Sequence, residues 1–383
     1  MTETVSFEDL IIQKIDNRGK TPPVIEQGYP LIEVNAITKN SIYPNPVKAT
    51  KYVNQATWDN WFRQHLQEDD ILFTTVGTIA ESAIVPRNPG YAIAQNILGF
   101  RFNKKIIDPL YALYMMRSTW FIDQISGRTI ETVQKSIKWA DMRGIKITLP
   151  DIQQQHKVVN IVKSLDEKIE LNRRMNETLE KMGQALFKHY FVDDTDSKTW
   201  PIVRLEESFD VVMGQSPPGS SYNEIGEGTV FYQGRAEFSV RYPKNRLFTT
   251  EPKRMAKKGD ILLSVRAPVG DINQATETCC VGRGVAAISS KDGLESFTYY
   301  QTKNLQKRFS DFNAEGTVFG AINGNQLKGL KIYQPPLEFR EEFNNLVKPL
   351  DVQILNNSVQ TEELTKLRDL LLPRLISGKI NVN

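Results

Sequence analysis

The chain has 383 residues, of which 40% are hydrophobic, and this length predicts more than one buried core and therefore two domains. Its formal net charge of +3 is too small to indicate nucleic-acid binding by itself, so residues that bind a polyanion must be gathered locally. The sequence shows no signal peptide or membrane span, and its two cysteines, Cys279 and Cys280, are adjacent, so we expect a cytoplasmic protein without disulfides or membrane contact.

Residues 1–149 alternate short apolar strands, turn signals and a few helices, which predicts a first mixed α+β head. The segment "DILFTTV" (70–76) has the pattern of a strand, and "PLYALYMMRSTWFIDQIS" (109–126) has helical periodicity. The polar and basic loops of this head are "DNRGKTPP" (16–23), "AITKNS" (36–41) and "SGRTIETVQKSIK" (126–138). Such side chains beside glycine turns suit contacts with DNA phosphates and base edges, although a single basic loop is more often a solvated surface.

Residues 150–192 predict one long central helix. Asp151 precedes it as an N-cap, with Gln154 three residues later in a weak capping box. Apolar residues recur at heptad spacing at two core positions, and the first of these positions also holds Asn172. The first position holds Val158, Leu165, Leu179 and Leu186, and the second holds Ile161, Met175 and Met182.

Residues 196–334 predict a second α+β head with the same succession of elements. Here "DILLSVR" (260–266) has the pattern of a strand, and "FTYYQTKNLQKRF" (297–309) corresponds to the helical segment of the first head. The polar and basic loops are "MGQSPPGSS" (213–221), "YQGRAEFSVRYPKNR" (232–246), "SVRAPVG" (264–270) and "CVGRGV" (280–285). Loops at matched positions in both heads favour a shared binding role.

Residues 335–383 predict a second, distal long helix with the same skeleton. Its first heptad position holds Phe343, Leu350, Leu364 and Leu371 together with Asn357, and its second holds Leu346 and Leu367. Pro373 has no counterpart in the first helix, so we expect a bend or break near it. Gly378 suits a C-terminal stop.

The helices belong to an internal repeat, in which "GIKITLP" (144–150) recurs as "GLKIYQP" (329–335). Two copies of one unit are commonly related by a pseudo-twofold axis, which would pair the helices as an antiparallel coiled coil. A helix of this length spans roughly 60 Å, and facing Asn172 and Asn357 would fix the register. In the alternative, each helix packs only on its own head and both asparagines lie at an exposed edge.

Two apparent enzyme motifs lack the neighbouring residues or the geometry that their chemistry requires. The tetrad "NPGY" (88–91) is close to the base-gripping motif of amino-methyltransferases, but no glycine-rich cofactor loop accompanies it. Asp151 with Asp166 and Lys168 formally fits a restriction-nuclease pattern, whose carboxylates must converge on Mg²⁺. About four turns of helix would separate Asp151 from the other two residues, so we interpret this match as accidental.

The apparent nucleotide and metal sites are also incomplete. The "GKT" at residues 19–21 lacks the first glycine of a phosphate-binding loop. His65, His156 and His189 are too scattered to form a metal cluster. We therefore predict no catalytic residue and no metal site in this chain.

One combination of segments is highly specific although each fragment is not. It consists of "GKTPP" (19–23), "GQSPP" (214–218), "GDILLS" (259–264), "GTVFGAINGNQLKGLKI" (316–332) and the two helical copies at 144–191 and 329–380. With these segments the chain resembles, over nearly its whole length, the DNA-specificity subunit of type I restriction–modification enzymes. The first head departs from the commoner family start in its long opening "NRGKTPPVIEQGYPLIEVNAI" (17–37), which leaves its base-contacting loop less defined than that of the second head.

The resemblance implies two target-recognition domains held apart by two conserved helices, each reading one half of a bipartite site in double-stranded DNA. The coil would set the gap and dock two methyltransferase subunits, with restriction and translocase subunits joining afterwards. This chain would be non-catalytic and hold no cofactor, while other subunits use S-adenosylmethionine, ATP and Mg²⁺ for adenine methylation and ATP-dependent cleavage. The rival interpretations are a scaffold whose heads bind protein and an enzyme with an unrecognised site.

These inferences single out two sets of residues. The candidate DNA-binding residues are Arg18, Lys20, Lys39, Gln95, Arg128 and Lys135 in the first head, and Gln233, Arg235, Arg246, Arg266 and Arg283 in the second. The candidate spacer and docking residues are Leu165, Asn172, Leu179, Leu350, Asn357 and Leu364.

Overall fold

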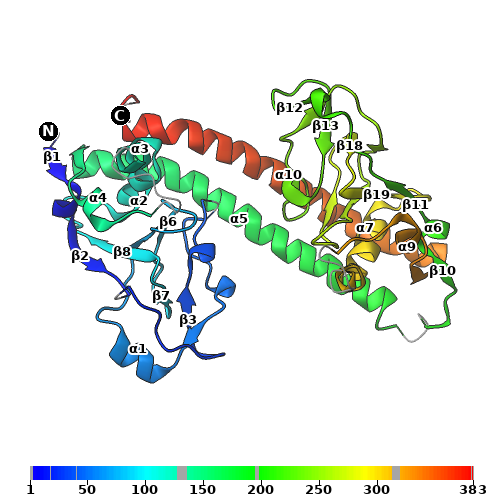
Figure 1. The fold of residues 1–383 in the computed structure, drawn as a ribbon, viewed down its shortest axis with the longest axis horizontal. Coiled ribbons are helices and arrows are strands. Elements are labelled where there is room, and N and C mark those ends of the chain that lie inside the picture. Colours follow the sequence, from blue (N-terminus) through cyan, green and yellow to red (C-terminus); the bar gives the residue numbers. More distant parts are fainter. Residues whose placement is uncertain are drawn as a thin grey trace. The chain divides into compact units, whose positions relative to one another are not determined.

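The computed structural model describes residues 3–17, 19–39, 41–126, 136–194, 198–312, 320–380 and 382 (Figure 1). The chain divides into two compact units, of which the first comprises residues 1–172 and 360–383 and the second comprises residues 173–359. The long helices α5 (Ile152–Phe191) and α10 (Leu337–Ile376) each contribute to both units. Every unit thus contains one head and a portion of both helices.

The first head is built on a four-stranded sheet of order β2-β8-β5-β6, a three-stranded sheet of order β4-β3-β7 and the pair β1-β9. The strands are β1 (Glu3–Ser6), β2 (Ile11–Ile15), β3 (Tyr29–Ile32), β4 (Tyr52–Val53), β5 (Ile71–Thr74), β6 (Ser82–Ile84), β7 (Ala92–Ile93), β8 (Ile97–Phe102) and β9 (Lys146–Leu149). Successive side chains of β5 point to opposite faces, so Ile71 and Phe73 enter the helix-covered core and Leu72 enters the core shared with Ile32. A strand buried on both faces explains the three consecutive apolar residues, 71–73, of the predicted strand at 70–76.

The second head repeats this architecture. Its sheets have the orders β11-β19-β16-β17 and β12-β14-β13-β18-β15, with the pair β10-β20. The strands are β10 (Ile202–Arg204), β11 (Phe209–Met213), β12 (Tyr222–Asn223), β13 (Thr229–Tyr232), β14 (Phe248–Thr249), β15 (Met255–Ala256), β16 (Ile261–Ser264), β17 (Ile272–Gln274), β18 (Cys279–Val281), β19 (Val285–Ser290) and β20 (Lys331–Tyr333). β16 matches β5, because Ile261 and Leu263 enter one core and Leu262 enters the other. The parallel pair β13–β18 likewise matches the parallel pair β3–β7. The predicted α+β heads and internal repeat are confirmed.

Short helices cover one face of each four-stranded sheet. The predicted helix at 109–126 is in fact two helices, because Ser118 interrupts it and its Oγ accepts a hydrogen bond from the Phe121 N–H at 3.3 Å. The matching segment of the second head is interrupted at Leu305. The short helices are α1 (Gln55–Trp61), α2 (Pro109–Arg117), α3 (Thr119–Ser126), α4 (Trp139–Arg143), α6 (Leu205–Ser208), α7 (Glu295–Asn304), α8 (Gln306–Asp311) and α9 (Gly324–Lys328).

The two long helices pair antiparallel within each unit (Figure 1). In the first unit Asp166 of α5 accepts a hydrogen bond from Arg368 of α10 at 2.9 Å. In the second unit Asn176 of α5 donates to Ser358 Oγ of α10 at 3.0 Å. Each unit also has a second pair that lies later in α5 and earlier in α10, namely Asn172–Gln360 in the first unit and Tyr190–Glu342 in the second, which is the signature of antiparallel packing. The coiled coil is confirmed, and the alternative in which each helix packs only on its own head is wrong.

The middle of the seam is polar. Asn172 is fully buried and donates to Gln360 Oε1 at 2.9 Å, while Asn357 donates to Asn176 Oδ1 at 2.9 Å. Buried amides need such partners, and their pairing disfavours other registers of the two helices. The predicted seam position of Asn172 and Asn357 is confirmed. The hydrogen bonds given above join each asparagine to another residue, Gln360 or Asn176, and not to the other seam asparagine.

The predicted second core position is wrong by one residue. Met175 and Met182 of α5 are 36% and 48% exposed, and Leu346 and Leu367 of α10 are 46% and 43% exposed. The first position is correct, and Leu165, Leu179, Leu350 and Leu364 are half-buried along the seam. The second position is held in α5 by Val162, Ile169, Asn176 and Gly183, and in α10 by Val347, Ile354, Thr361 and Arg368. Its polar members concealed it from a search for apolar periodicity.

Of the bend or break expected at Pro373, the break is wrong, since α10 continues through this residue to Ile376. Proline removes one backbone donor near the end of the helix, and Leu372 and Leu375 still pack into the core of the first head. Gly378 has a φ of +68° two residues beyond the helix, which confirms it as the stop. At the same end of the coil, Asp151 caps α5 by accepting from the Gln154 N–H at 3.0 Å.

Candidate nucleic-acid interface

Four loops of the second head meet at one end of the sheet β11-β19-β16-β17. The Gly214 N–H donates to the Val285 carbonyl at 2.9 Å, and the Gly284 N–H donates to the Gln233 carbonyl at 3.2 Å. The Val265 N–H donates in turn to the Gly284 carbonyl at 3.0 Å. Residues 214–216, 233–235, 265–267 and 282–284, with the bridged Ala321, are called the second polar edge.

Glycines allow these loops to approach one another closely. A Cβ on Gly284 would lie 2.7 Å from the Gln233 carbonyl oxygen, and one on Gly214 would lie 2.1 Å from the Gly282 carbonyl oxygen. Both distances are shorter than any normal contact, so only glycine fits at these positions. The glycine turns noted in the sequence therefore build the second polar edge.

Four of the five candidates in the second head lie at this edge. The side chains of Gln233, Arg235, Arg266 and Arg283 are all exposed there. Arg235 also pairs with Asp271 at 2.9 Å, in a contact that is half open to solvent. Surface pairs of this kind contribute little and can exchange for another anion.

Arg246 differs from the other four. Its guanidinium contacts Glu224 at 2.7 Å and Glu237 at 2.6 Å, and Glu237 is itself buried. The hydrogen bond that Arg246 donates to Glu237 raises the pKa of Arg246. Arg246 thus steadies the turn at 235–237, and its role in DNA binding remains a prediction.

The first head has a corresponding edge. The Thr75 N–H donates to the Asn96 carbonyl at 2.9 Å, and the Ile137 N–H donates to the Thr75 carbonyl at 2.9 Å. Val76 bridges Ser136 as Arg266 bridges Ala321 in the second head. Residues 75–77, 95–97 and 136–137 are called the first polar edge.

The described candidates of the first head lie at or near this edge. Gln95 is exposed beside Asn96, and the exposed Lys20 follows β2 at the same end of the sheet. Lys39 lies 4.0 Å from Glu81, just after the turn that begins at Thr75. Burial raises the pKa of Glu81, and Lys39 and Arg117 oppose that shift. Arg18, Arg128 and Lys135 lie outside the described residues.

Sequence reasoning missed several residues that these edges contain. Asn96 and Thr75 join the loops of the first edge, and Ser216 Oγ accepts from the Arg283 N–H at 3.3 Å in the second. Ser216 lies within the quoted loop "GQSPP", so its motif carried a signal. For Asn96, the signal in the sequence was its position beside the candidate Gln95.

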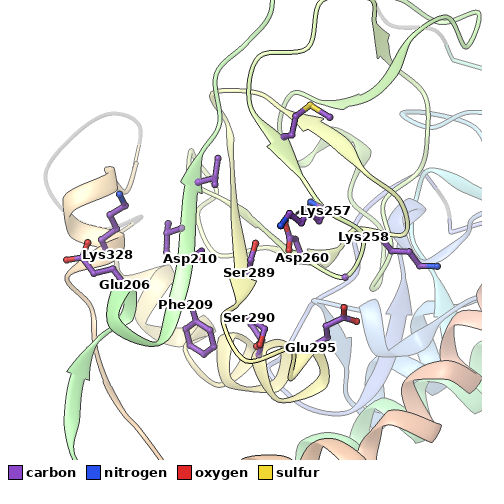
Figure 2. Close-up of a pocket in the computed structure, with 16 residues that line it drawn as sticks. Glu206, Phe209, Asp210, Lys257, Lys258, Asp260, Ser289, Ser290, Glu295 and Lys328 are labelled. Carbon is purple, nitrogen blue, oxygen red and sulfur yellow. Dashed lines mark hydrogen bonds between the residues drawn. The ribbon is translucent and has the colours of Figure 1, made fainter.

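A pocket of about 660 Å³ in the second unit lies at the opposite end of the same sheet (Figure 2). It is lined by Phe209 at the start of β11, by Ser290 at the end of β19 and by Asp260 just before β16. Lys257, Lys258 and Lys328 face Glu206, Asp210 and Glu295 around it, so its charges are mixed. The pocket is therefore separate from the second polar edge and shows no preference for an anion.

Chemical groups for catalysis are sparse in the described part of the chain. Within the described residues, no group of three or more His, Cys, Asp or Glu side chains could hold a metal ion. Burial raises the pKa of Cys279 to about 12, so its thiol is not a ready nucleophile. None of the described helices is long and apolar enough to cross a membrane.

Two heads of one fold, each with an edge of exposed polar side chains, on a shared pair of helices define a two-headed recognition protein. A family model described as "Type I restriction modification DNA specificity domain" matches residues 12–181 and 197–368. The chain belongs to this family of type I restriction–modification DNA-specificity subunits.

Individual relatives agree with the family model. The chain is 32% identical to a protein of Methanocaldococcus jannaschii named as the type I restriction enzyme MjaX specificity subunit, over 93% of this chain and 88% of that one. It is 24% identical to the MjaIX specificity subunit of the same organism, over 80% of this chain and 78% of that one. The crystal structure of a type I restriction–modification S subunit from M. genitalium shares the fold, with a TM-score of 0.60 and 16% identity over 98% and 96% of the two chains.

Proposed function

We propose that each polar edge reads one half of a bipartite DNA site and that the paired helices set the gap between the halves. The observation that carries this proposal is the occurrence of the same edge, built from the same sheet end, once in each head. The loops differ between the heads, while the long helices and the order of the four-stranded sheet are kept. This is the pattern expected if the heads read different bases from a common frame.

The chemistry of the second polar edge supports contact with base edges. Arginine pairs with guanine through two hydrogen bonds, and glutamine pairs with adenine in the same way. Arg266 and Arg283 present their guanidinium groups from loops fixed by backbone hydrogen bonds, and Gln233 presents its amide beside them. Fixed loops lower the entropy lost on binding, which favours selective recognition.

Exposed apolar residues of the long helices support docking of partner subunits. In the second unit, Met175 and Met182 of α5 and Val352 and Val359 of α10 are each at least about one-third exposed. Exposed apolar side chains that gather into a patch mark an interaction surface. We assign this surface to two methyltransferase subunits, with restriction and translocase subunits joining the complex. This chain would supply recognition, while those subunits supply S-adenosylmethionine, ATP and Mg²⁺ chemistry.

Exchange of one head is expected to change one half-site only. Residues 196–334 would be replaced by the corresponding head of the MjaX relative, and the chain expressed with its methyltransferase subunits. Sequencing of methylated motifs in the host DNA should show a new second half, an unchanged first half and an unchanged gap. A change in both halves would contradict independent reading by the two heads.

The scaffold interpretation predicts a different result and is not favoured by the family match. A protein-binding scaffold would not discriminate between duplex sequences, and any weak DNA binding would show little salt dependence. Competition between unrelated duplexes at two salt concentrations separates these cases. Turnover by the isolated chain, with S-adenosylmethionine or ATP supplied, would instead favour an unrecognised enzyme site.

A further inference from the structure

An arginine of the second head is buried between the two long helices, within the second unit. Arg241 is only 3% exposed, and its Nη1 lies 2.9 Å from Glu180 of α5 while its Nη2 lies 2.8 Å from Asp351 of α10. The guanidinium carbon lies 3.9 Å from the ring centre of Tyr299. The Arg241 side chain of the head therefore forms an ion pair with one carboxylate from each helix.

Two tyrosines of α7 complete this cluster. The Tyr299 hydroxyl donates to Glu180 at 3.0 Å, and the Tyr300 hydroxyl donates to Asp351 at 3.1 Å. Room for Tyr300 comes from Gly183 of α5, where a Cβ would lie 2.2 Å from the tyrosine oxygen. The cluster joins the head to both helices through charged groups that water barely reaches, and such groups are costly to leave unpaired.

The chain around Arg241 leads directly to the second polar edge. Residues 235–241, called the anchor segment, run beside β17, the edge strand of the four-stranded sheet. Arg235 pairs with Asp271 just before β17 at 2.9 Å, and the Ser239 N–H donates to Asn273 Oδ1 at 3.0 Å.

The anchor segment remains tied to β17 as far as Arg241. The Asn273 amide donates to the Ser239 carbonyl at 2.9 Å, and the Gln274 N–H donates to the Arg241 carbonyl at 2.8 Å. Gln233 and Arg235 thus lie at one end of a short tethered segment, and Arg241 lies at the other.

Beyond its 3₁₀ turn at Arg235–Glu237, the anchor segment has no regular secondary structure of its own. Its path depends on the contacts at its two ends and on the amide of Asn273. Loss of the cluster at Arg241 would release the end that is joined to the helices.

We propose that Arg241 is a positioning residue for DNA reading, which fixes Gln233 and Arg235 relative to the helices that set the gap. This inference rests on the proposed function of the second polar edge. Arg241 touches no DNA itself, because it is buried in the helix-facing side of the head. A head transplanted onto these helices needs a cation at the same place, since Glu180 and Asp351 would otherwise be buried without one.

The test compares Arg241→Met with a matched control, Arg340→Met. Arg340 of α10 is also largely buried and pairs with Asp292 of the head, but lies outside the anchor segment. Each full-length variant, assembled with its methyltransferase subunits, is used to select from a pool of duplex DNA with randomised sequence. Arg241→Met should reduce discrimination at the second half-site by about tenfold or more and leave the first half-site intact, whereas Arg340→Met should preserve both.

A second variant and a second measurement keep the inference testable if Arg241→Met fails to fold. Arg241→Lys keeps a buried cation and should retain part of the discrimination. Hydrogen exchange of residues 233–246 in the full chain should increase in Arg241→Met and not in Arg340→Met, whether or not DNA is present. Equal effects of the two methionine variants on both readouts, or unchanged exchange in Arg241→Met, would overturn the inference. If the unaltered chain selects no sequence, the proposed function fails, and the exchange measurement still tests the anchor.

Discussion

Removal of one heptad from each long helix is expected to shorten the gap between the DNA half-sites by about three base pairs. Seven helical residues rise about 10 Å, and one base pair of duplex rises about 3.4 Å. The suitable residues are those opposed in the polar middle of the seam, Arg173–Leu179 of α5 and Leu355–Thr361 of α10. Their removal preserves heptad phase and keeps the buried contacts of Asp166 and Arg241 on either side.

The deletion also removes Gln360, which accepts a hydrogen bond from Asn172, so Asn172→Leu is included because the buried amide would lose that acceptor. The matched control carries Asn172→Leu without the deletion and should keep the original gap. The gap is read from methylated motifs in the DNA of a host that also carries the methyltransferase subunits. An unchanged gap in the shortened protein would show that the helices do not set the spacing.

Replacement of Arg368 by methionine is expected to destabilise the first unit by about 3 kcal/mol or more. Asp166 is 5% exposed and accepts the Arg368 Nη1 hydrogen bond at 2.9 Å. Burial lowers the pKa of Arg368, but hydrogen bonds and charge from Asp166 and Asp369 outweigh it, so the net shift is upward. The arginine therefore stays charged at all ordinary pH, and its removal leaves the Asp166 carboxylate buried beside the packed seam.

The measurement is urea unfolding of the full chain, with hydrogen exchange of residues 360–376 to locate the loss. Adding Asp166→Leu should recover most of the stability, because an apolar pair can replace a buried ion pair. Lys366→Met is the matched control, since Lys366 is exposed and pairs with Glu362 along the same helix; it should change stability by less than about 0.5 kcal/mol. Similar losses for Arg368→Met and Lys366→Met would disprove a structural role for the buried pair.

The antiparallel helices were predictable because both the repeat and the seam asparagines are visible in the sequence. The second seam position was not predictable from the sequence. Apolar spacing selected Met175 and Leu367, whereas the seam holds Asn176 and Arg368. These polar residues are satisfied by partners on the other helix, so the local sequence gives no reason to bury them. Apolar residues outside the seam instead form the exposed surface that we assign to partner subunits.

The polar edges were predictable to a similar extent. Glycine turns flank Arg283 and Gln233, and the structure shows that these glycines permit the close approach of the loops. Arg241 lies in the same basic loop as Arg235, and composition alone did not distinguish the buried arginine from the exposed one. Its burial depends on Glu180 and Asp351, which are remote in sequence and become its partners only after folding.

The central claim is that one chain reads two separated pieces of DNA at a distance fixed by its helices. Its most direct test is selection from a randomised duplex pool by the full-length chain, assembled with its methyltransferase subunits. The predicted result is two short motifs separated by an unspecified stretch of constant length. Enrichment of one contiguous motif, or of two motifs at variable separation, would contradict the claim.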